Sequence, residues 1–211
     1  MKHSRRTLRL KEYDYSSNGI YFVTICTHHR LSLFGTCAEG EFIPNAAGCM
    51  IEAAWQDLAN RFPHMTSGLL GIMPNHIHGL ITIHPQQNTG RGEPRVRPNY
   101  EPHSRTETDD DKDHPYAQPS GTMPNSLGRI IQAFKSITTV TYIDGMKHYG
   151  WQSFHGKLWQ RNYYEHVIRN EAELHRARQY IIDNPIRWAL DRENPDVIRA
   201  MTPKEKPQDV G

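Results

Sequence analysis

Two histidines one residue apart, His76 and His78, constrain this chain most, because they lie in the otherwise apolar and β-branched residues 71–83 (GIMPNHIHGLITI). Such a run favours a β-strand, and Pro74 and Asn75 are typical of the turn that begins one. Side chains alternate between the faces of a strand, so both imidazoles point to one face while Ile77 points the other way, into a core. The spacing therefore predicts two imidazoles that can share one divalent cation.

The histidine pair has a plainer explanation, since 13 histidines in 211 residues allow such a spacing by chance. A histidine in a strand often only satisfies a local hydrogen bond. Two imidazoles also leave a divalent cation short of ligands. A metal site therefore requires a third protein group from elsewhere in the chain, with positions left for substrate oxygens or water.

The length of 211 residues suits one domain with a genuine hydrophobic core, and we take one catalytic domain as the starting assumption. The net charge of +2 neither demands nor excludes a polyanionic partner. Three cysteines without a C-x-x-C spacing indicate a reducing compartment. No run of about 18 apolar residues is available to span a bilayer. We therefore expect no membrane partner and a cytoplasmic location, associated with the nucleoid if the partner is DNA.

Hydrophobic periodicity predicts the order of the elements. Residues 20–27 and 65–72 favour strands, as the histidine run does, and residues 44–62 and 127–143 have helical spacing. Residues 151–161 favour a short strand and turn, residues 163–169 the start of a helical region, and residues 171–183 a helix closed by Asn184 and Pro185. The order β, α, β, β, α, β predicts an α+β fold of the ferredoxin-like or RRM-like split βαβ type, in which an antiparallel sheet carries two helices on one face.

Composition separates three further parts of the chain. Residues 1–19 are a basic arm ahead of the catalytic domain, which we place at residues 20–190. Within that domain, a low-complexity insertion at about 85–125 buries too little apolar surface to fold alone, so we expect it to be mobile. Residues 191–211 are Pro-rich and charged, and we expect a frayed tail.

Five stretches carry a resemblance to a known family: residues 19–27, 73–83, 126–139, 158–169 and 180–188. In them the chain resembles the single-tyrosine HUH transposases and, within these, the REP-associated tyrosine transposases, which act on short palindromic repeats of bacterial genomes. In that superfamily two metal-binding histidines flank a bulky hydrophobic residue, as His76 and His78 flank Ile77. A tyrosine nucleophile on a separate helix is followed four residues later by an amide, as Tyr180 is by Asn184.

The resemblance implies His76, His78 and Asn184 as metal ligands and Tyr180 as the nucleophile, carried by a C-terminal helix. The asparagine at position 184 is similar to what the REP-associated group has there, whereas more distant relatives have Gln. Lys135, in a stretch that matches the family's AFKS, is implied to lie near the scissile phosphate and to offset developing charge. Two imidazoles and an amide oxygen suit Mg²⁺ or Mn²⁺, of which Mn²⁺ tolerates nitrogen ligands better.

The residue types fit this chemistry on their own terms. A phenol with a pKa of about 10 is a poor nucleophile at neutral pH, so it depends on a cation that polarises the scissile phosphate. Attack by the tyrosine gives a 5′-phosphotyrosine and a free 3′-OH. Because the phosphodiester energy is conserved, a later 3′-OH can rejoin the strand without ATP, and cleavage and joining become one reversible reaction.

The implied partner is single-stranded or hairpin DNA with REP-like palindromes, because a strand in a small site must expose its phosphate and splay its bases. The resemblance suggests that Arg5, Arg6 and Arg9 of the arm contact guide nucleotides of the repeat. Further basic positions near the site are expected to follow the DNA backbone, and aromatic ones to stack on bases: Arg129, Lys157, Arg161, Trp159 and Tyr163. The REP-associated group implies a monomer, with a homodimer as the alternative.

Other hypotheses stay open at this point. Tyr163 or Tyr164, with His166 as a base, could replace Tyr180 as the nucleophile. The chain could be a catalytically silent module that only holds REP hairpins. It could also be a metal-dependent nuclease in which water attacks in place of tyrosine.

Overall fold

The computed structural model describes residues 18–85, 125–191, 193–195 and 197. The basic arm expected at residues 1–19, which contains Arg5, Arg6 and Arg9, lies outside the described residues apart from its last two positions. Nearly all of the insertion expected at about 85–125 lies outside them as well, as do residues 198–211 of the expected tail.

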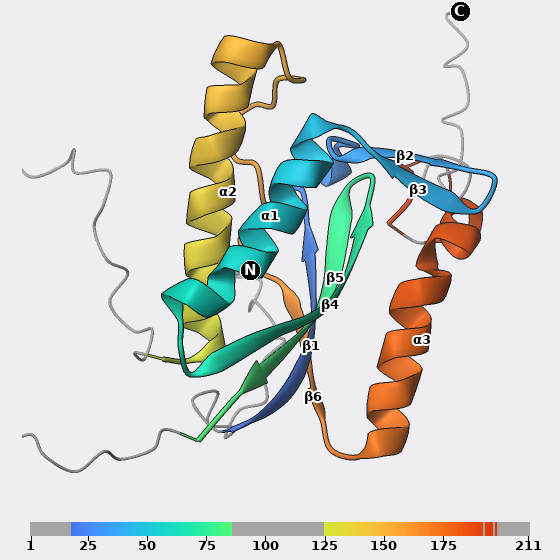
Figure 1. Cartoon of the computed structure of the whole chain (residues 1–211). Coiled ribbons are helices and arrows are strands. Elements are labelled where there is room, and N and C mark those ends of the chain that lie inside the picture. Colours follow the sequence, from blue (N-terminus) through green and yellow to red (C-terminus); the bar gives the residue numbers. More distant parts are fainter. Residues whose placement is uncertain (1–17, 86–124, 192, 196, 198–211) are drawn as a thin grey trace, which may run out of the picture.

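A four-stranded antiparallel sheet forms the centre of the molecule, in the strand order β4-β5-β1-β6 (Figure 1). The strands are β1 (Gly19–Cys26), β4 (Met65–Met73), β5 (His76–Ile83) and β6 (Tyr164–Ile168). Within β1, Thr24 pairs with His78 of β5 on one side and with Tyr164 of β6 on the other. Residues paired across antiparallel strands point to the same face, so these three side chains form one row.

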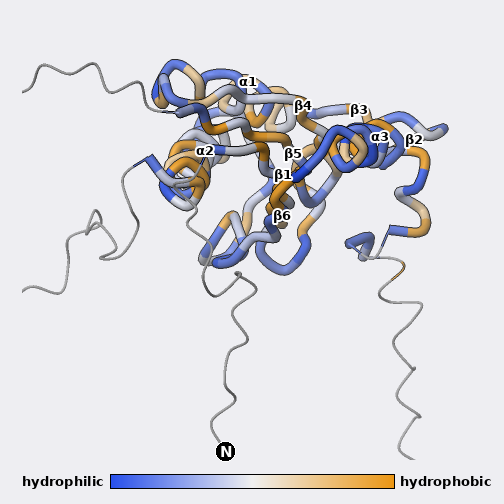
Figure 2. Tube along the Cα trace, turned by 90° about the horizontal axis from the view of Figure 1, so that it is seen from below, coloured by the Kyte–Doolittle hydropathy of each residue, from blue (hydrophilic) through white to orange (hydrophobic). Residues whose placement is uncertain are grey.

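Two helices, α1 (Ala46–Arg61) and α2 (Leu127–Tyr149), cover one face of this sheet, and α3 (Glu171–Arg187) lies along the other (Figures 1 and 2). The main core lies on the side of α1 and α2, where Trp55, Phe134 and Ile77 are buried. Gly79 permits this packing, because a Cβ atom there would lie 2.3 Å from the Trp55 ring. A smaller cluster on the α3 side holds Phe22, Leu80, Leu174 and Ile181.

Local signals start and end these helices. Asn45, Ser126 and Asn170 precede α1, α2 and α3, and each side chain accepts a hydrogen bond from the backbone N–H three residues later. Gly150 ends α2 in the left-handed conformation (φ 66°), which glycine adopts without a steric penalty. The α+β class, the split βαβ order and the two helices on one face are confirmed, as is the separate C-terminal helix.

Several boundaries differ from the predictions. The prediction of a helical start at residues 163–169 is wrong, because this segment is the edge strand β6, paired with β1. Residues 151–161 form no strand beyond a single bridge between Trp159 and Thr27. Helix α2 continues to Tyr149, and α3 runs through Pro185 to Arg187. Between β1 and α1, where the sequence analysis predicts no element, lies a hairpin of β2 (Gly35–Ala38) and β3 (Glu41–Pro44).

Two short 3₁₀ turns complete the described elements: η1 (His28–Arg30) follows β1, and η2 (Trp188–Leu190) follows α3. Among the described residues, no helix has both the length and the hydrophobicity needed to cross a bilayer.

Candidate functional site

The two histidines of β5 converge on one point beneath α3. His76 and His78 are buried, and their Nε2 atoms lie 2.9 Å apart. Each ring is held through its other nitrogen: His76 Nδ1 lies 2.8 Å from Asn75 Oδ1, and His78 Nδ1 lies 2.8 Å from Thr24 Oγ1. Partners of this kind fix the orientation of imidazoles in metal sites, and here they hold both rings in position.

Neighbouring hydrogen bonds determine which nitrogen of His76 carries its proton. The amide nitrogen of Asn75 donates to the carbonyl oxygens of Arg30 (3.2 Å) and Glu193 (2.6 Å), so its Oδ1 atom faces His76. This oxygen can only accept, and Nδ1 of His76 must therefore donate to it. In the neutral ring the Nε2 atom is then left with a lone pair that points at His78, which is the form in which imidazole binds a cation.

Both imidazoles are neutral. Burial lowers the pKa of His78 to about 4. Burial also lowers the pKa of His76 well below its usual value, and a second proton there would be repelled by a protonated His78 and by Arg30 as well. Neutral rings carry lone pairs that a cation can use without displacing a proton at physiological pH.

A third donor, Asp191, comes from the segment that follows α3. Its Oδ2 atom lies 3.9 Å from His76 Nε2, and one ligand atom from each of Asp191, His76 and His78 falls within 4.8 Å of the others. These three residues could hold a metal ion. The sequence analysis missed Asp191, because the residue lies in a stretch without hydrophobic periodicity that we assigned to the tail.

The expectation of a frayed tail from residue 191 is wrong for its first described residues. The carbonyl oxygen of Glu193 accepts from Asn75, and the Glu193 carboxylate forms an ion pair with Arg30. Asn194 is buried and donates to the carbonyl of Trp188. Arg30 reaches this segment from a left-handed backbone conformation (φ 55°), which non-glycine residues adopt at a cost. These contacts hold Asp191 beside the histidines.

Asn184, the ligand implied by the family resemblance, lines the cavity between α3 and the sheet that also holds His78 and Asp191. Its side chain is buried, and Oδ1 has no hydrogen-bond partner among the described residues. A buried amide oxygen without a partner is costly unless something else binds it. The donors present are thus two imidazole nitrogens, a carboxylate and an amide oxygen, and this set fits a small divalent cation.

Tyr180 stands directly beside the histidine pair. Its ring centroid lies 5.0 Å from that of His78 and 5.9 Å from that of Phe22, and the residue is 42% exposed. Positions four apart share a helix face, so α3 turns Tyr180 and Asn184 toward the same cavity. Burial, followed by the charge of Asp191, raises the pKa of Tyr180 and outweighs the Asn184 side chain, which lowers it. The phenol is therefore neutral at physiological pH.

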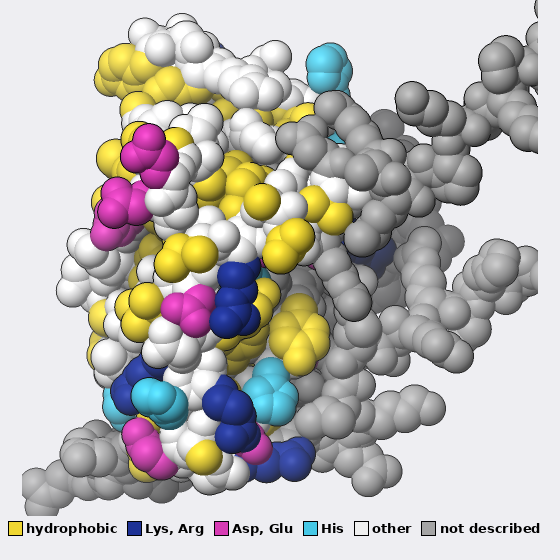
Figure 3. Space-filling view, turned by 90° about the vertical axis from the view of Figure 1, so that its right-hand side faces the viewer, with side chains coloured by type: hydrophobic (Ala, Val, Ile, Leu, Met, Phe, Trp, Pro, Cys, Tyr) yellow, Lys and Arg dark blue, Asp and Glu magenta, His cyan; other side chains and the backbone are white. Residues whose placement is uncertain are grey.

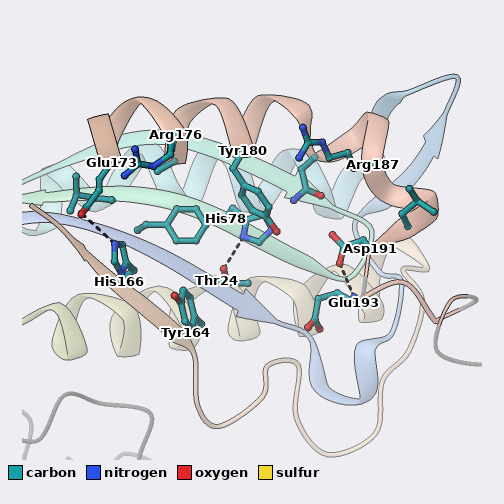
Figure 4. A pocket seen from close by; sticks show the side chains of 15 residues that line it. Thr24, His78, Tyr164, His166, Glu173, Arg176, Tyr180, Arg187, Asp191 and Glu193 are labelled. Atoms are coloured by element: carbon teal, nitrogen blue, oxygen red, sulfur yellow. Dashed lines mark hydrogen bonds and ion pairs between the residues drawn. The ribbon is translucent and has the colours of Figure 1, made fainter. Parts of the chain in front are cut away.

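These side chains line a cavity of about 1100 Å³ between α3 and the sheet (Figure 4). Figure 3 shows the α3 side of the molecule, where basic, acidic and histidine side chains surround apolar ones. The sheet, α3 and the segment after it all contribute to the lining: Phe22, Thr24, His78, Tyr164, His166, Ile168, Glu173, Arg176, Ala177, Tyr180, Asn184, Arg187, Leu190, Asp191 and Glu193.

Some predicted site residues lie elsewhere. Lys135 does not line the cavity: its Nζ atom donates to the carbonyl oxygens of residues 160–162, at 2.8, 3.3 and 3.2 Å. The prediction that Trp159 stacks on DNA is wrong, because its ring is buried in the main core and its indole N–H donates to Thr138. Tyr163 packs against the same core under the Lys135 ammonium. The remaining predicted DNA contacts do not line the cavity either: Arg129, Lys157 and Arg161.

No family model matches this chain. Two solved structures are similar to it at low identity. One is a candidate transposase of Deinococcus radiodurans R1, at 14% identity and a TM-score of 0.40, covering 82% of this chain and 94% of that one. The other is the REP-associated tyrosine transposase bound to a REP hairpin, at 19% identity and a TM-score of 0.47, covering 96% of this chain and 94% of that one.

A protein relative shows a much stronger sequence match. An uncharacterized protein of Haemophilus influenzae strain Rd is 31% identical over 194 residues, which make up 90% of this chain and 93% of that protein. Identity at this level extends over nearly the whole of both chains. The chain belongs to the same protein family as this Haemophilus influenzae protein.

Proposed function

We propose that this protein is a metal-dependent DNA strand transferase of the REP-associated tyrosine transposase type, which cuts and rejoins single-stranded DNA beside hairpins through Tyr180. One observation carries the proposal: a half-exposed phenol on α3 lies against an imidazole whose Nε2 converges with that of a second one. The residue-by-residue match of His76, His78, Tyr180 and Asn184 to the family's motifs supports the same conclusion.

The cation would be held by His76 and His78, with Asp191 or Asn184 supplying oxygen, and Mg²⁺ or Mn²⁺ suits this donor set. When bound, such an ion withdraws charge from the non-bridging oxygens of a phosphate. Thr24 and Asn75 would keep the two imidazoles directed at it through their Nδ1 atoms. Arg30 would keep the segment that carries Asp191 in place through its ion pair with Glu193.

Tyr180 would carry out the transfer. Its phenolic oxygen forms a bond to phosphorus, the bond from phosphorus to the 3′ oxygen breaks, and the phenolic proton ends on that oxygen as a 3′-OH. The product is a 5′-phosphotyrosine, and attack by a 3′-OH reverses the same steps to join strands. Because the pKa of Tyr180 is raised, the phenol must lose its proton as the new bond forms.

Single-stranded DNA is the substrate that fits the cavity. The histidine pair lies beneath α3, so only a strand whose phosphate and bases are free of a partner strand can reach it. Arg176 and Arg187 line the cavity on either side of Tyr180 along α3. Their guanidinium groups would bind phosphates that flank the reacting one.

The test incubates the full chain and Mn²⁺ with labelled hairpin oligonucleotides that carry randomised single-stranded flanks, and then separates the products by denaturing electrophoresis. We expect a covalent protein–DNA adduct that Tyr180→Phe abolishes. Tyr164→Phe is the matched control, since Tyr164 lines the same cavity and is also about half exposed, and this variant should still form the adduct. Cleaved DNA without an adduct would indicate attack by water, and binding alone would indicate a silent module.

Substitution of a metal-site histidine should separate DNA cleavage from hairpin binding. We expect His76→Ala to abolish cleavage and to leave hairpin binding within about twofold, because the buried imidazole acts on one phosphate while other surfaces hold the hairpin. Circular dichroism checks that the variant is folded. Loss of hairpin binding together with cleavage, in a folded His76→Ala protein, would contradict this separation.

A further inference from the structure

We propose that the end of the cavity around Tyr164 is a nucleobase subsite, in which an unpaired base next to the scissile phosphate lies against the Tyr164 ring and is read at its edge by His166. This inference rests on the proposed function and adds a recognition element to it. The juxtaposition that carries it is a half-exposed aromatic ring on the edge strand, in the same row of the sheet as the metal-facing His78.

The distance across the sheet matches one nucleotide. Tyr164 and His78 both pair with Thr24, so they stand two strand spacings apart, roughly 9–10 Å. A nucleotide whose phosphate lies at the histidine pair can place its base over Tyr164. The neighbouring Phe22 forms the floor between them, with its ring stacked on that of His78 at 5.5 Å and edge-on to Tyr164 at 6.4 Å.

The ring of Tyr164 is available for stacking. The residue is 50% exposed, and its edge-on contact with Phe22 leaves the rest of the ring to the cavity (Figure 4). Strand β6 pairs with β1 and holds the ring on a rigid element. Bases stack on such rings with little regard to their identity, because every base has a π face.

Polar side chains lie in the same part of the cavity as this ring. His166 follows Tyr164 on the same face of β6 and lies 3.4 Å from Glu173 at the start of α3. Glu173 is itself fixed, because its carboxylate accepts from the backbone N–H of Arg169 at 2.9 Å. The pair thus presents an oriented imidazole to the cavity. Imidazole nitrogens can donate to or accept from a Watson–Crick edge.

The charge of the cavity suits the phosphate of the same nucleotide. Arg176 lines the cavity one helical turn before Tyr180 and has no ion-pair partner within the part of the chain that the structure describes. Of the acidic groups of the lining, Glu173 lies beside His166 and Glu193 pairs with Arg30, while Asp191 lies at the other end of the cavity beside the neutral His76. A cation without an ion-pair partner in the same cavity as an open aromatic ring matches the composition of a single-strand binding groove.

The test measures binding without chemistry, using Tyr180→Phe protein without divalent metal and a hairpin oligonucleotide whose single-stranded flank carries one abasic position at a time. We expect an abasic site at one position of the flank to weaken binding roughly 5- to 150-fold, the range expected for one stacked base. Adding Tyr164→Ala should weaken binding of the intact oligonucleotide equally and remove any further effect of that abasic position. Tyr164→Phe should bind like the parent protein, and Tyr149→Ala, at a ring 73% exposed on α2, should change nothing.

The proposal is overturned if Tyr164→Ala binds intact DNA like the parent, or if its effect simply adds to that of every abasic position. Reading by His166 is tested separately, by placing each of the four bases at the sensitive position. In His166→Ala the affinities for the four bases should become more alike. Unchanged differences among the four affinities would overturn the reading by His166. Because no cleavage is measured, absence of an adduct would count against the proposed function without deciding this one.

Discussion

The two faces of the central sheet differ in what covers them. On the α1 and α2 side, large rings such as Trp55 and Phe134 meet edge to face, at 5.6 Å between centroids, inside a continuous core. On the α3 side the described residues form one small buried cluster, of Phe22, Leu80, Leu174 and Ile181. Beside this cluster lies the cavity, whose lining includes histidine, tyrosine, acidic and arginine side chains. The fold therefore draws most of its stability from one face and leaves the other for polar groups.

Strand β5 links the two faces, because alternate residues serve each of them. Ile77 and Ile81 enter the main core, while His76 and His78 point toward α3. A site built on such a strand is held in position by packing on the opposite face. This division makes the comparison testable: changes on the core face should affect folding first, and changes on the α3 face should affect ligand binding first.

The largest effect on stability should come from the core face. Phe134→Ala should lower the free energy of unfolding by about 3–5 kcal/mol, because the ring is fully buried and leaves a cavity. Leu174→Ala, at the margin of the smaller cluster, should cost about 2 kcal/mol. Urea denaturation followed by circular dichroism measures both. An equal or larger loss for Leu174→Ala would contradict the proposed division between the faces.

The next largest effect should come from Asn75→Ala, which should lower both the free energy of unfolding and the affinity for Mn²⁺. Asn75→Ala removes the acceptor for His76 and the donor to the carbonyls of Arg30 and Glu193, all in a buried place. We expect a loss of about 1–3 kcal/mol in unfolding free energy. Mn²⁺ affinity by calorimetry should fall about 10- to 100-fold, because the ring of His76 loses its orientation. The exposed Asn60→Ala is the control, and equal behaviour of both variants would remove Asn75 from the site.

A smaller and more selective effect should follow from Thr24→Val, which keeps the shape of the side chain and removes the hydroxyl bound to His78 Nδ1. We expect Mn²⁺ affinity to fall about tenfold. The free energy of unfolding should change by less than about 1 kcal/mol, since only one hydrogen bond is lost. Unchanged Mn²⁺ affinity would show that the hydroxyl does not orient the imidazole.

The smallest effect should be a pH dependence that involves the core face alone. Burial lowers the pKa of Lys135 to about 8 from 10.5, against the charge of Cys26, which raises it. Between these values the unfolded chain holds a proton that the folded chain has lost, so the Lys135 contribution to stability rises with pH across that window. The melting temperature of the wild type should therefore rise relative to that of Lys135→Met between about pH 8 and pH 10. Parallel curves would contradict the lowered pKa.

Sequence patterns predicted the elements whose signals are local. Alternation and helical spacing located β1, β5, α1 and α3, and the same alternation directed His76 and His78 to one face. Strand β6 was mistaken because five residues with mixed polarity carry little periodicity, and their pairing with β1 decides their conformation. Asp191 and Lys135 could not be placed, since long-range contacts with Asn75, Arg30 and residues 160–162 determine where they lie.

The most direct test of the central claim is to identify the residue that becomes joined to DNA. After reaction with a hairpin oligonucleotide and nuclease trimming, trypsin separates the candidates, because Tyr180 lies in residues 179–187 and both Tyr163 and Tyr164 lie in residues 162–169. We predict a nucleotide attached through phosphate to Tyr180 in the first peptide. Attachment to Tyr163 or Tyr164, or cleaved DNA with no modified peptide, would contradict the account.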